Sequence, residues 1–303
     1  MINHPRDKIQ PDITGDEGES CVKDYFCGWY LKSQNDFQTL ALIPACHFCG
    51  NVKSCSLQVI TGTDSWNIQF PFSQFRRDRG GISIGRNQFA KWGCSLEIQS
   101  DVVDIQGELA FGSFTPITYD IMGPFRWVPF MECRHSVFSM HHRVDGLIRV
   151  NGEEFRFDGG VGYAEGDRGR SFPKEYLWTQ CCFPGGSLML SVADIPFCGF
   201  RFTGVIGVIW YEGREYRLAT YLGAKAVQTR REKVVIRQGR MTLTVRCPEE
   251  KGRPLAAPVA GEMKRIIREN AACTCSYYLQ ENGKTVFQFT SRAAAFEYEY
   301  SQE

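Results

Sequence analysis

Two carboxylic acids stand close together near the middle of the chain. Glu165 and Asp167 are two residues apart, so both side chains lie on one face if this segment is extended. Two neighbouring carboxyls tend to share a proton, which raises one apparent pKa and makes an acid that works near neutral pH. In a functional site, one of the two donates the proton and the other, with Arg168, orients it. In a structural role, both pair with Arg168 or Arg170 instead.

Asp194 is a further acid candidate, because it ends a strongly apolar run directly before Ile195 and Pro196. An Asp that caps a turn explains this position equally well. Three tryptophans are candidates for lining a ligand cavity, although burial in a core accounts for them too. These are Trp29, Trp127 and Trp178.

Histidine and cysteine spacings do not predict a metal site. Residues 46–49 read Cys-His-Phe-Cys, but the second Cys pair that a zinc ribbon needs 15–20 residues later is absent from the sequence. His135 and His141 share a strand face without a clear third ligand. Residues 81–85 match the Gly-x-Ser-x-Gly pattern of hydrolases, yet no helix is expected after them, as that motif requires. We therefore expect no metal, no cofactor and no hydrolase activity.

Composition narrows the class of protein further. The 303 residues are 43% hydrophobic and 23% charged, which is typical of a globular chain. A net charge of +1 argues against binding nucleic acid, which depends on neutralising phosphates. The sequence has no apolar run of about 18 residues, and because its first ten residues are mostly polar we expect no signal peptide there. With 13 cysteines, an odd number without a framework spacing, we expect reduced thiols and a cytoplasmic protein.

The elements that must position these residues are strands. Residues 147–157 and 277–289 each read as strand, Asn-Gly turn and strand, the strongest local signal of a β-hairpin. Residues 205–220 form a third strand, turn and strand pattern. Only residues 261–270 have helical spacing, with apolar side chains at i, i+3 and i+4. The fold class is therefore all-β, with one short helix expected.

An internal repeat divides this set of strands. Residues 23–25 match residues 174–176 at an offset of about 151, and each half ends with an Asn-Gly hairpin followed by a Glu. We predict two homologous β domains, residues 1–168 and residues 169–303. Each half holds enough strands to close a barrel, which removes exposed edges and can enclose one small apolar ligand.

The junction between the halves resembles the tocopherol cyclases and their bacterial relatives. The resembling pattern is Tyr-x-Glu, a polar residue, Gly, Phe-Pro, an aromatic-x-Trp and Gln-Cys across residues 163–181. Residues 25–32, with their aromatic Gly-Trp-Tyr-x-Lys sequence, resemble the same family, as do residues 121–125 and 131–135.

This resemblance implies two tandem lipocalin-like antiparallel β domains, shared with the carotenoid hydratases of the same broad superfamily. It also implies protonation of an alkene in a prenylated quinol or other polyene lipid, followed by ring closure through the phenol oxygen or by hydration. On that basis the catalytic candidates are Glu165, Asp167 and Asp194, and the substrate-binding candidates are Trp29, Tyr30, Trp127, His135, Tyr163, Trp178 and Gln180. The expected partner is a hydrophobic small molecule, and peripheral contact with a membrane is left open.

Two positions depart from the family pattern. Arg168 stands where the family usually has Trp, and Cys182 stands where Asn is common. An Arg beside a carboxyl favours its ionised form, which is the wrong state for a proton donor. The alternative function is therefore a non-catalytic carrier or sensor that binds an apolar ligand.

Overall fold

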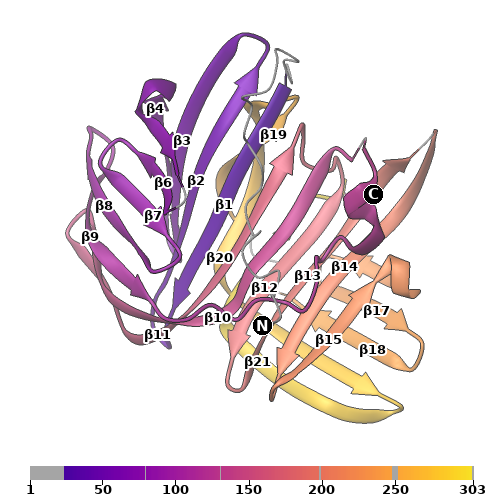
Figure 1. The fold of residues 1–303 in the computed structure, drawn as a ribbon. Helices are drawn as coiled ribbons and strands as arrows, with labels where there is room; N and C mark the ends of the chain where they lie inside the picture. Colours follow the sequence, from indigo (N-terminus) through magenta and orange to yellow (C-terminus); the bar gives the residue numbers. More distant parts are fainter. Residues whose placement is uncertain (1–23, 79, 130, 198, 248–251, 302–303) are drawn as a thin grey trace, which may run out of the picture.

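The chain folds into two large antiparallel sheets (Figure 1), along whose strands buried and more exposed side chains often alternate. The computed structural model describes residues 24–78, 80–129, 131–197, 199–247 and 252–301. In these residues strands predominate, and the helical elements are three short 3-10 turns, η1 (Phe72–Gln74), η2 (Gly123–Trp127) and η3 (Thr220–Leu222). The all-β prediction is confirmed. None of the helices in the described part of the chain is long and apolar enough to cross a membrane.

The first sheet is built from the N-terminal half of the chain. Its strands are β1 (Asp24–Gln34), β2 (Thr39–Cys49), β3 (Val52–Thr61), β4 (Ser65–Pro71), β5 (Phe75–Arg77), β6 (Gly81–Ile84), β7 (Asn87–Ala90), β8 (Gly93–Gln99), β9 (Asp104–Phe111), β10 (Cys133–Val150) and β11 (Glu153–Gly169). They pair in the order β4-β3-β2-β1-β11-β10-β9-β8-β7-β6-β5. Because η1 joins the edge strands β4 and β5 directly, the sheet curls into a nearly closed, lipocalin-like barrel.

The second sheet repeats this arrangement in the C-terminal half. Its strands are β12 (Tyr176–Phe183), β13 (Gly186–Phe197), β14 (Phe200–Tyr211), β15 (Arg214–Ala219), β16 (Lys225–Arg230), β17 (Lys233–Gln238), β18 (Met241–Arg246), β19 (Arg253–Val259), β20 (Glu262–Glu281) and β21 (Lys284–Tyr298). The order is β15-β14-β13-β12-β21-β20-β18-β17-β16, and β19 pairs with β20 outside this path. The edge strands β15 and β16 are again connected by a 3-10 turn, η3.

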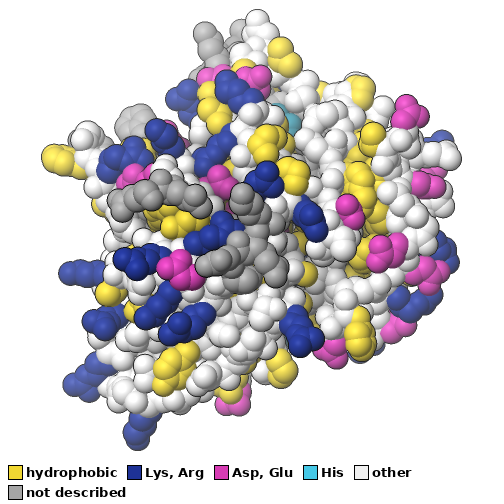
Figure 2. Space-filling model, turned by 180° about the vertical axis from the view of Figure 1, so that it is seen from behind, with side chains coloured by type: hydrophobic (Ala, Val, Ile, Leu, Met, Phe, Trp, Pro, Cys, Tyr) yellow, Lys and Arg dark blue, Asp and Glu magenta, His cyan; other side chains and the backbone are white. Residues whose placement is uncertain are grey.

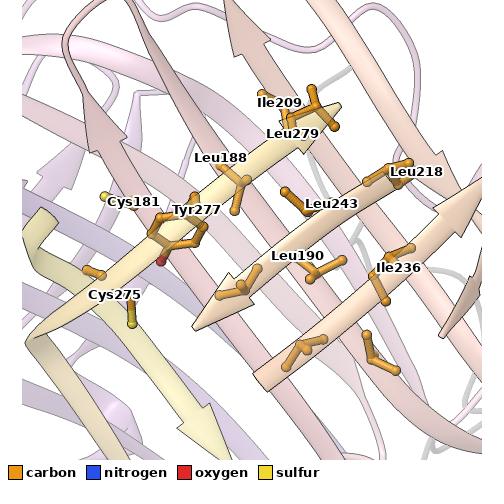
Figure 3. Close-up of a cluster of buried hydrophobic side chains, with 14 of the residues drawn as sticks. Cys181, Leu188, Leu190, Ile209, Leu218, Ile236, Leu243, Cys275, Tyr277 and Leu279 are labelled. Atoms are coloured by element: carbon orange, nitrogen blue, oxygen red, sulfur yellow. The ribbon is translucent and has the colours of Figure 1, made fainter. Parts of the chain in front are cut away.

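Each sheet encloses its own apolar core, and a third core joins the two sheets. Figure 3 shows part of the second sheet's core, where Leu188 and Leu190 of β13 lie in one cluster with Ile236 of β17. The core between the sheets contains Tyr30, Ile60, Trp178, Val208 and Ile267 among others. The sheets therefore pack face to face through buried side chains. The face seen in Figure 2 is rich in charged groups, with Lys and Arg gathered toward the left and Asp and Glu toward the right.

The repeat is visible in the strand register. Ala41 lies opposite Lys32 and Ile60, and Met189 lies opposite Gln180 and Val208, so the first three strands of each sheet match at an offset of 148 residues. The sequence match predicted about 151. The sequence match differs by three residues because it aligned the residues at which the two strands begin. The longer strand β1 starts further ahead of its paired residues than β12 does.

In the last strands, Glu165 opposite Tyr30 corresponds to Glu297 opposite Trp178. The first sheet ends at Gly169 and the second begins at Tyr176. Whether the chain divides into two folding units at residues 168 and 169 stays a prediction.

The prediction of a helix at residues 261–270 is wrong. This segment is the first half of β20, and its alternate side chains Ile267, Glu269 and Ala271 are buried while their neighbours are more exposed. The apolar residues at helical spacing misled the sequence argument because Ile266, one of the three, is 63% exposed on the outer side of the strand. Tertiary pairing with β19 and β21 overrides the local spacing.

The predicted Asn-Gly hairpins are confirmed. Asn151 and Gly152 join β10 to β11, and Asn282 and Gly283 join β20 to β21, all with positive φ angles. A similar turn at Gly261 joins β19 to β20 and packs on the first sheet, where a Cβ atom would overlap the carbonyl oxygen of Phe48. The Gly261 amide also donates to the Arg170 carbonyl oxygen at 2.7 Å, which ties this turn to the segment between the sheets.

Candidate active site

A pocket of about 170 Å³ lies between the two sheets, and both contribute to its wall. Its sides are mostly apolar and aromatic, with Phe26, Ile43, Phe125, Phe172, Trp178 and Leu255 among them. The sequence argument placed a ligand inside a barrel. In the structure each barrel interior is an apolar core of buried side chains, and this pocket opens where the outer faces of the two sheets meet.

Glu165 and Asp167 both face this pocket from β11, as their spacing predicts. His135 of β10 lies between them. Its Nδ1 atom is 2.9 Å from Asp167 Oδ1, and its Nε2 atom is 3.0 Å from Glu165 Oε2. Tyr163, two residues before Glu165, donates its hydroxyl to Glu165 Oε2 at 2.5 Å. The result is a buried chain of polar groups on an otherwise apolar wall.

The charge on this chain follows from its neighbours. Burial lowers the pKa of His135, but the charges of Glu165 and Asp167 outweigh burial and hold that pKa well above its usual value. His135 is therefore a cation between two acidic groups near neutral pH. The Nδ1 side of the ring makes a hydrogen bond with Asp167, and the Nε2 side lies within ion-pair distance of Glu165.

A second acidic pair faces the first from the other sheet. Glu269 of β20 and Glu297 of β21 lie directly opposite each other in the strand register, and both line the pocket. The hydroxyl of Tyr30 donates to Glu269 Oε1 at 2.5 Å, and that of Tyr176 donates to Glu297 Oε2 at 2.5 Å. Glu269 is fully buried and Glu297 is 8% exposed.

Burial and mutual repulsion keep protons on this pair. Burial raises the pKa of Glu269 to about 7, and the Glu165 charge adds to the rise, while the Tyr30 hydroxyl and the Lys32 charge oppose it. Burial and the charge of Glu269 raise the pKa of Glu297 well above its usual value. Two carboxyls this close in an apolar wall share a proton and titrate as a pair. Glu297 is thus a neutral carboxylic acid near pH 7.

Aromatic rings surround these carboxyls. Tyr30 and Trp178 meet edge to face across the two sheets, with ring centroids 5.2 Å apart. Phe172, from the segment between the sheets, contacts Phe26 at 5.4 Å and Tyr176 at 6.1 Å. Among the described residues, the Trp178 indole nitrogen has no hydrogen-bond partner. Aromatic faces of this kind can stabilise a cation beside the acid.

Of the other predicted site residues, some lie at the pocket and others do not. Trp29 lines the pocket and also packs against the first core. Tyr163 and Gln180 are buried behind the wall, where Gln180 accepts from Lys32 Nζ at 3.1 Å. Trp127 is 76% exposed, away from the pocket wall. Asp194 is an ion-pair partner of Arg201 at 2.5 Å and does not join the other carboxyls.

Glu269, Glu297 and Tyr176 belong to the site but were not predicted. The repeat was the available signal for Glu297, since it is the counterpart of Glu165. Glu269 was hidden by the helical interpretation of its segment, because only a strand places it in line with the buried Ile267 and Ala271.

His135, Glu165 and Asp167 are also close enough to be considered as metal ligands. A histidine binds a metal through one ring nitrogen, whereas here the two carboxyls lie on opposite nitrogens of the ring. Chelation by all three would require the imidazole to turn away from one carboxyl. The geometry favours a chain for holding and moving protons.

The fold and the site together define a class of protein: two tandem lipocalin-like sheets with a buried acidic pocket between them. No protein-family model matches the chain. Over 105 residues it is 30% identical to the chloroplastic tocopherol cyclase of Zea mays, which is 31% of this chain and 22% of that protein. The chain therefore spans about a fifth of that relative's length, and the resemblance seen in the motifs is confirmed for that stretch.

Solved structures share the fold over most of the chain. CghA bound to Sch210972 superposes with a TM-score of 0.60 at 9% identity, covering 92% of this chain and 89% of that one. Kievitone hydratase of Nectria haematococca gives 0.50 at 12% identity, covering 91% and 88%. An AttH protein of Nitrosomonas europaea gives 0.52 at 10% identity, covering 92% of both chains. These similarities establish the two-sheet, lipocalin-like architecture.

Proposed function

We propose that this protein is an acid–base catalyst that protonates an alkene in a prenylated quinol or other polyene lipid, leading to cyclisation or hydration. The observation that carries the proposal is the Glu269–Glu297 pair, a carboxylic acid kept neutral in an apolar, aromatic pocket. Protonating an alkene requires such an acid, because a free carboxyl with a pKa near 4 is ionised at neutral pH.

Each group has a part in the proposed reaction. Glu297 gives its proton to one alkene carbon, and the electron pair of the double bond forms the new C–H bond. The positive charge on the neighbouring tertiary carbon is stabilised by the rings of Trp178 and Tyr30 and by the negative groups across the pocket.

The second half of the reaction restores the acid. An oxygen nucleophile, a phenol of the substrate or a water molecule, bonds to the cationic carbon and gives up its proton to a carboxylate. Glu269, paired with Glu297, is placed to receive it and return the shared proton. The unpartnered Trp178 indole N–H can hold the nucleophile by donating to its oxygen. Cyclisation then leaves the molecular formula of the substrate unchanged, and hydration adds one water molecule to it.

The carrier alternative depended on Arg168 pairing with the acidic residues. Among the ion pairs of the described residues, none joins Arg168 to Glu165 or Asp167. Arg168 lies on the opposite face of β11, near Tyr25 and Cys27, where burial raises the pKa of both groups and the charge of Arg168 opposes that rise. This arrangement supports a catalytic pocket over a disabled one.

The similar proteins add support from their names. The curated relative from Zea mays is a cyclase, and one of the solved structures is a hydratase. Both names fit a site that protonates an alkene and lets an oxygen attack. The substrate, the cytoplasmic location and peripheral membrane contact remain proposals for this chain.

The test is a turnover screen with prenyl quinols and polyenes, read by mass and retention of the product. Glu297→Gln should lower the rate of an active substrate by roughly 10²–10⁴, the usual contribution of a general acid. Glu281→Gln, at the far end of β20, is the matched control and should leave the rate unchanged. If Glu297→Gln keeps full activity while Glu165→Gln or Asp167→Asn abolishes it, the acid is on the first sheet. If no substrate turns over, the carrier alternative is favoured.

A further inference from the structure

His47 is a buried polar group that the proposed reaction does not use. It is 3% exposed, and its Nε2 atom lies 3.0 Å from Ser56 Oγ. Among the described residues, its Nδ1 atom has no hydrogen-bond partner. Burial lowers the pKa of His47 to about 4, so the ring is neutral near pH 7. A neutral imidazole with one ring nitrogen engaged has the other available for a ligand.

The strand alternation aims His47 at the pocket. Ile43, Ala45 and His47 all line the pocket from one face of β2, while Cys46 packs in a separate core on the other face. Two apolar side chains of β19, Leu255 and Pro258, also line the pocket.

The other polar side chain at this end is already satisfied. Gln58 lines the pocket, but its amide donates to the carbonyl oxygen of Ala256 at 3.0 Å and accepts from the Ala256 amide at 2.8 Å. It therefore offers the ligand little. Of the two, His47 is the side chain with an open hydrogen-bonding position.

His47 is far from the acids. It lies opposite Phe26 on β1, four residues from Tyr30, which lies opposite Glu165 and contacts Trp178. Four residues of strand and two steps across the sheet, from β2 through β1 to β11, separate His47 from Glu165 by about 16 Å. His47 and the acids line the same pocket, so a ligand that contacts both must reach across this length.

We propose that His47 recognises an oxygen function at the end of the substrate remote from the alkene that is protonated. The substrate class is then an elongated isoprenoid or aryl-isoprenoid chain with a hydroxyl or carbonyl group at one end and the reacting double bond at the other. This inference rests on the proposed function for the reacting end. The hydrogen bond between His47 Nε2 and Ser56 Oγ is compatible with either tautomer of the ring, and a ligand hydroxyl suits either one because it both donates and accepts.

The test compares two probes of matched length, farnesol, which ends in a hydroxyl, and farnesene, which does not. Binding is followed by quenching of tryptophan fluorescence, since Trp29 and Trp178 line the pocket. We expect the native protein to bind farnesol roughly tenfold or more tightly than farnesene, because farnesene leaves His47 buried and unpaired.

Three variants test whether the preference for farnesol over farnesene depends on His47. His47→Leu should bring the two affinities within about twofold, and His47→Gln should retain part of the difference. Trp178→Phe, at the other end of the pocket, should keep the full preference. Thermal unfolding of each variant confirms that it folds.

Equal affinity of the native protein for both probes, or no binding of either, would overturn the inference and leave His47 holding water only. So would a preference that survives in His47→Leu. These results distinguish a failure of the His47 proposal from a failure of the proposed function. A farnesol preference that depends on His47 with no turnover of any substrate refutes catalysis alone, whereas turnover that depends on Glu297 without the preference refutes only the role of His47.

Discussion

Glu269 holds a proton at a pH where an exposed glutamate has lost it. Because the folded pKa of about 7 exceeds that of the unfolded chain, the folded state binds more protons between these values. The stabilising contribution is fully present below about pH 4.5 and is lost as the pH rises through about 7.

We therefore expect the melting temperature to fall between pH 5 and pH 8, and Glu269→Gln to flatten this slope. The variant should melt higher than the native protein at pH 8 and close to it at pH 4.5. Thermal unfolding across that range measures the difference, with Glu281→Gln, at the far end of β20, as the control. A variant whose slope equals the native one would show that Glu269 is ionised throughout.

Replacing His135 should lower the free energy of unfolding by more than the loss of one imidazole ring would suggest. It is the cation between Glu165 and Asp167, so His135→Leu leaves two acidic groups in an apolar wall without compensation. Breaking a buried pair in this way costs about 3–5 kcal/mol. Denaturant unfolding at pH 7 should show the loss, and at pH 5 part of it should return as the carboxyls take up protons. A loss that is the same at both values would mean that the carboxyls are neutral beside His135.

At the scale of elements, β20 shows where sequence reasoning succeeds and where it fails. The strand class, the hairpins and the closeness of Glu165 and Asp167 could be predicted, because they depend on alternation, turn residues and local spacing. Glu269 could not be placed, since Met263, Ile266 and Ile267 mimic a helix and only pairing with β19 and β21 decides the strand. His135 was a candidate, but its place between Glu165 and Asp167 depends on register shifts within the β10–β11 hairpin, which a single sequence does not specify.

The alternation of β20 gives a direct test of this element. Ala271 is buried between the sheets, and Thr274 is exposed three residues later. In a helix these two positions would share a face. In the strand, Ala271→Asp should destabilise the protein by about 2 kcal/mol or more through burial of an unpaired charge, while Thr274→Asp stays within about 0.5 kcal/mol. Denaturant unfolding of the two variants measures both; equal losses would contradict the strand assignment.

At the scale of the whole molecule, the repeat explains how the site is assembled. Tyr30 and Trp178, Ala41 and Met189, and Ile60 and Val208 are equivalent positions, and all six lie in the core between the sheets. Each half thus presents the same face to the other. The carboxyls follow this rule, with Glu165 from one half and Glu297 from the other.

Separate halves should therefore fail to remain monomeric. Residues 24–169 and 170–301 expressed alone expose the apolar face that the other half covers, and such faces drive association. We expect each half to aggregate or to be recovered only when the two are co-expressed, as judged by size-exclusion chromatography. Two monodisperse, folded halves would show that the contact between the sheets is dispensable.

The position of the pocket between the sheets, described above, has a consequence for how a ligand can be found. A molecule bound there contacts both halves at once. Its binding therefore strengthens the contact between the halves, and its affinity is linked to the stability of the whole molecule. At a free concentration 100 times its dissociation constant, a ligand confined to the folded state adds about 2.7 kcal/mol to the free energy of unfolding. A thermal-shift library can thus report the true ligand before any product is known.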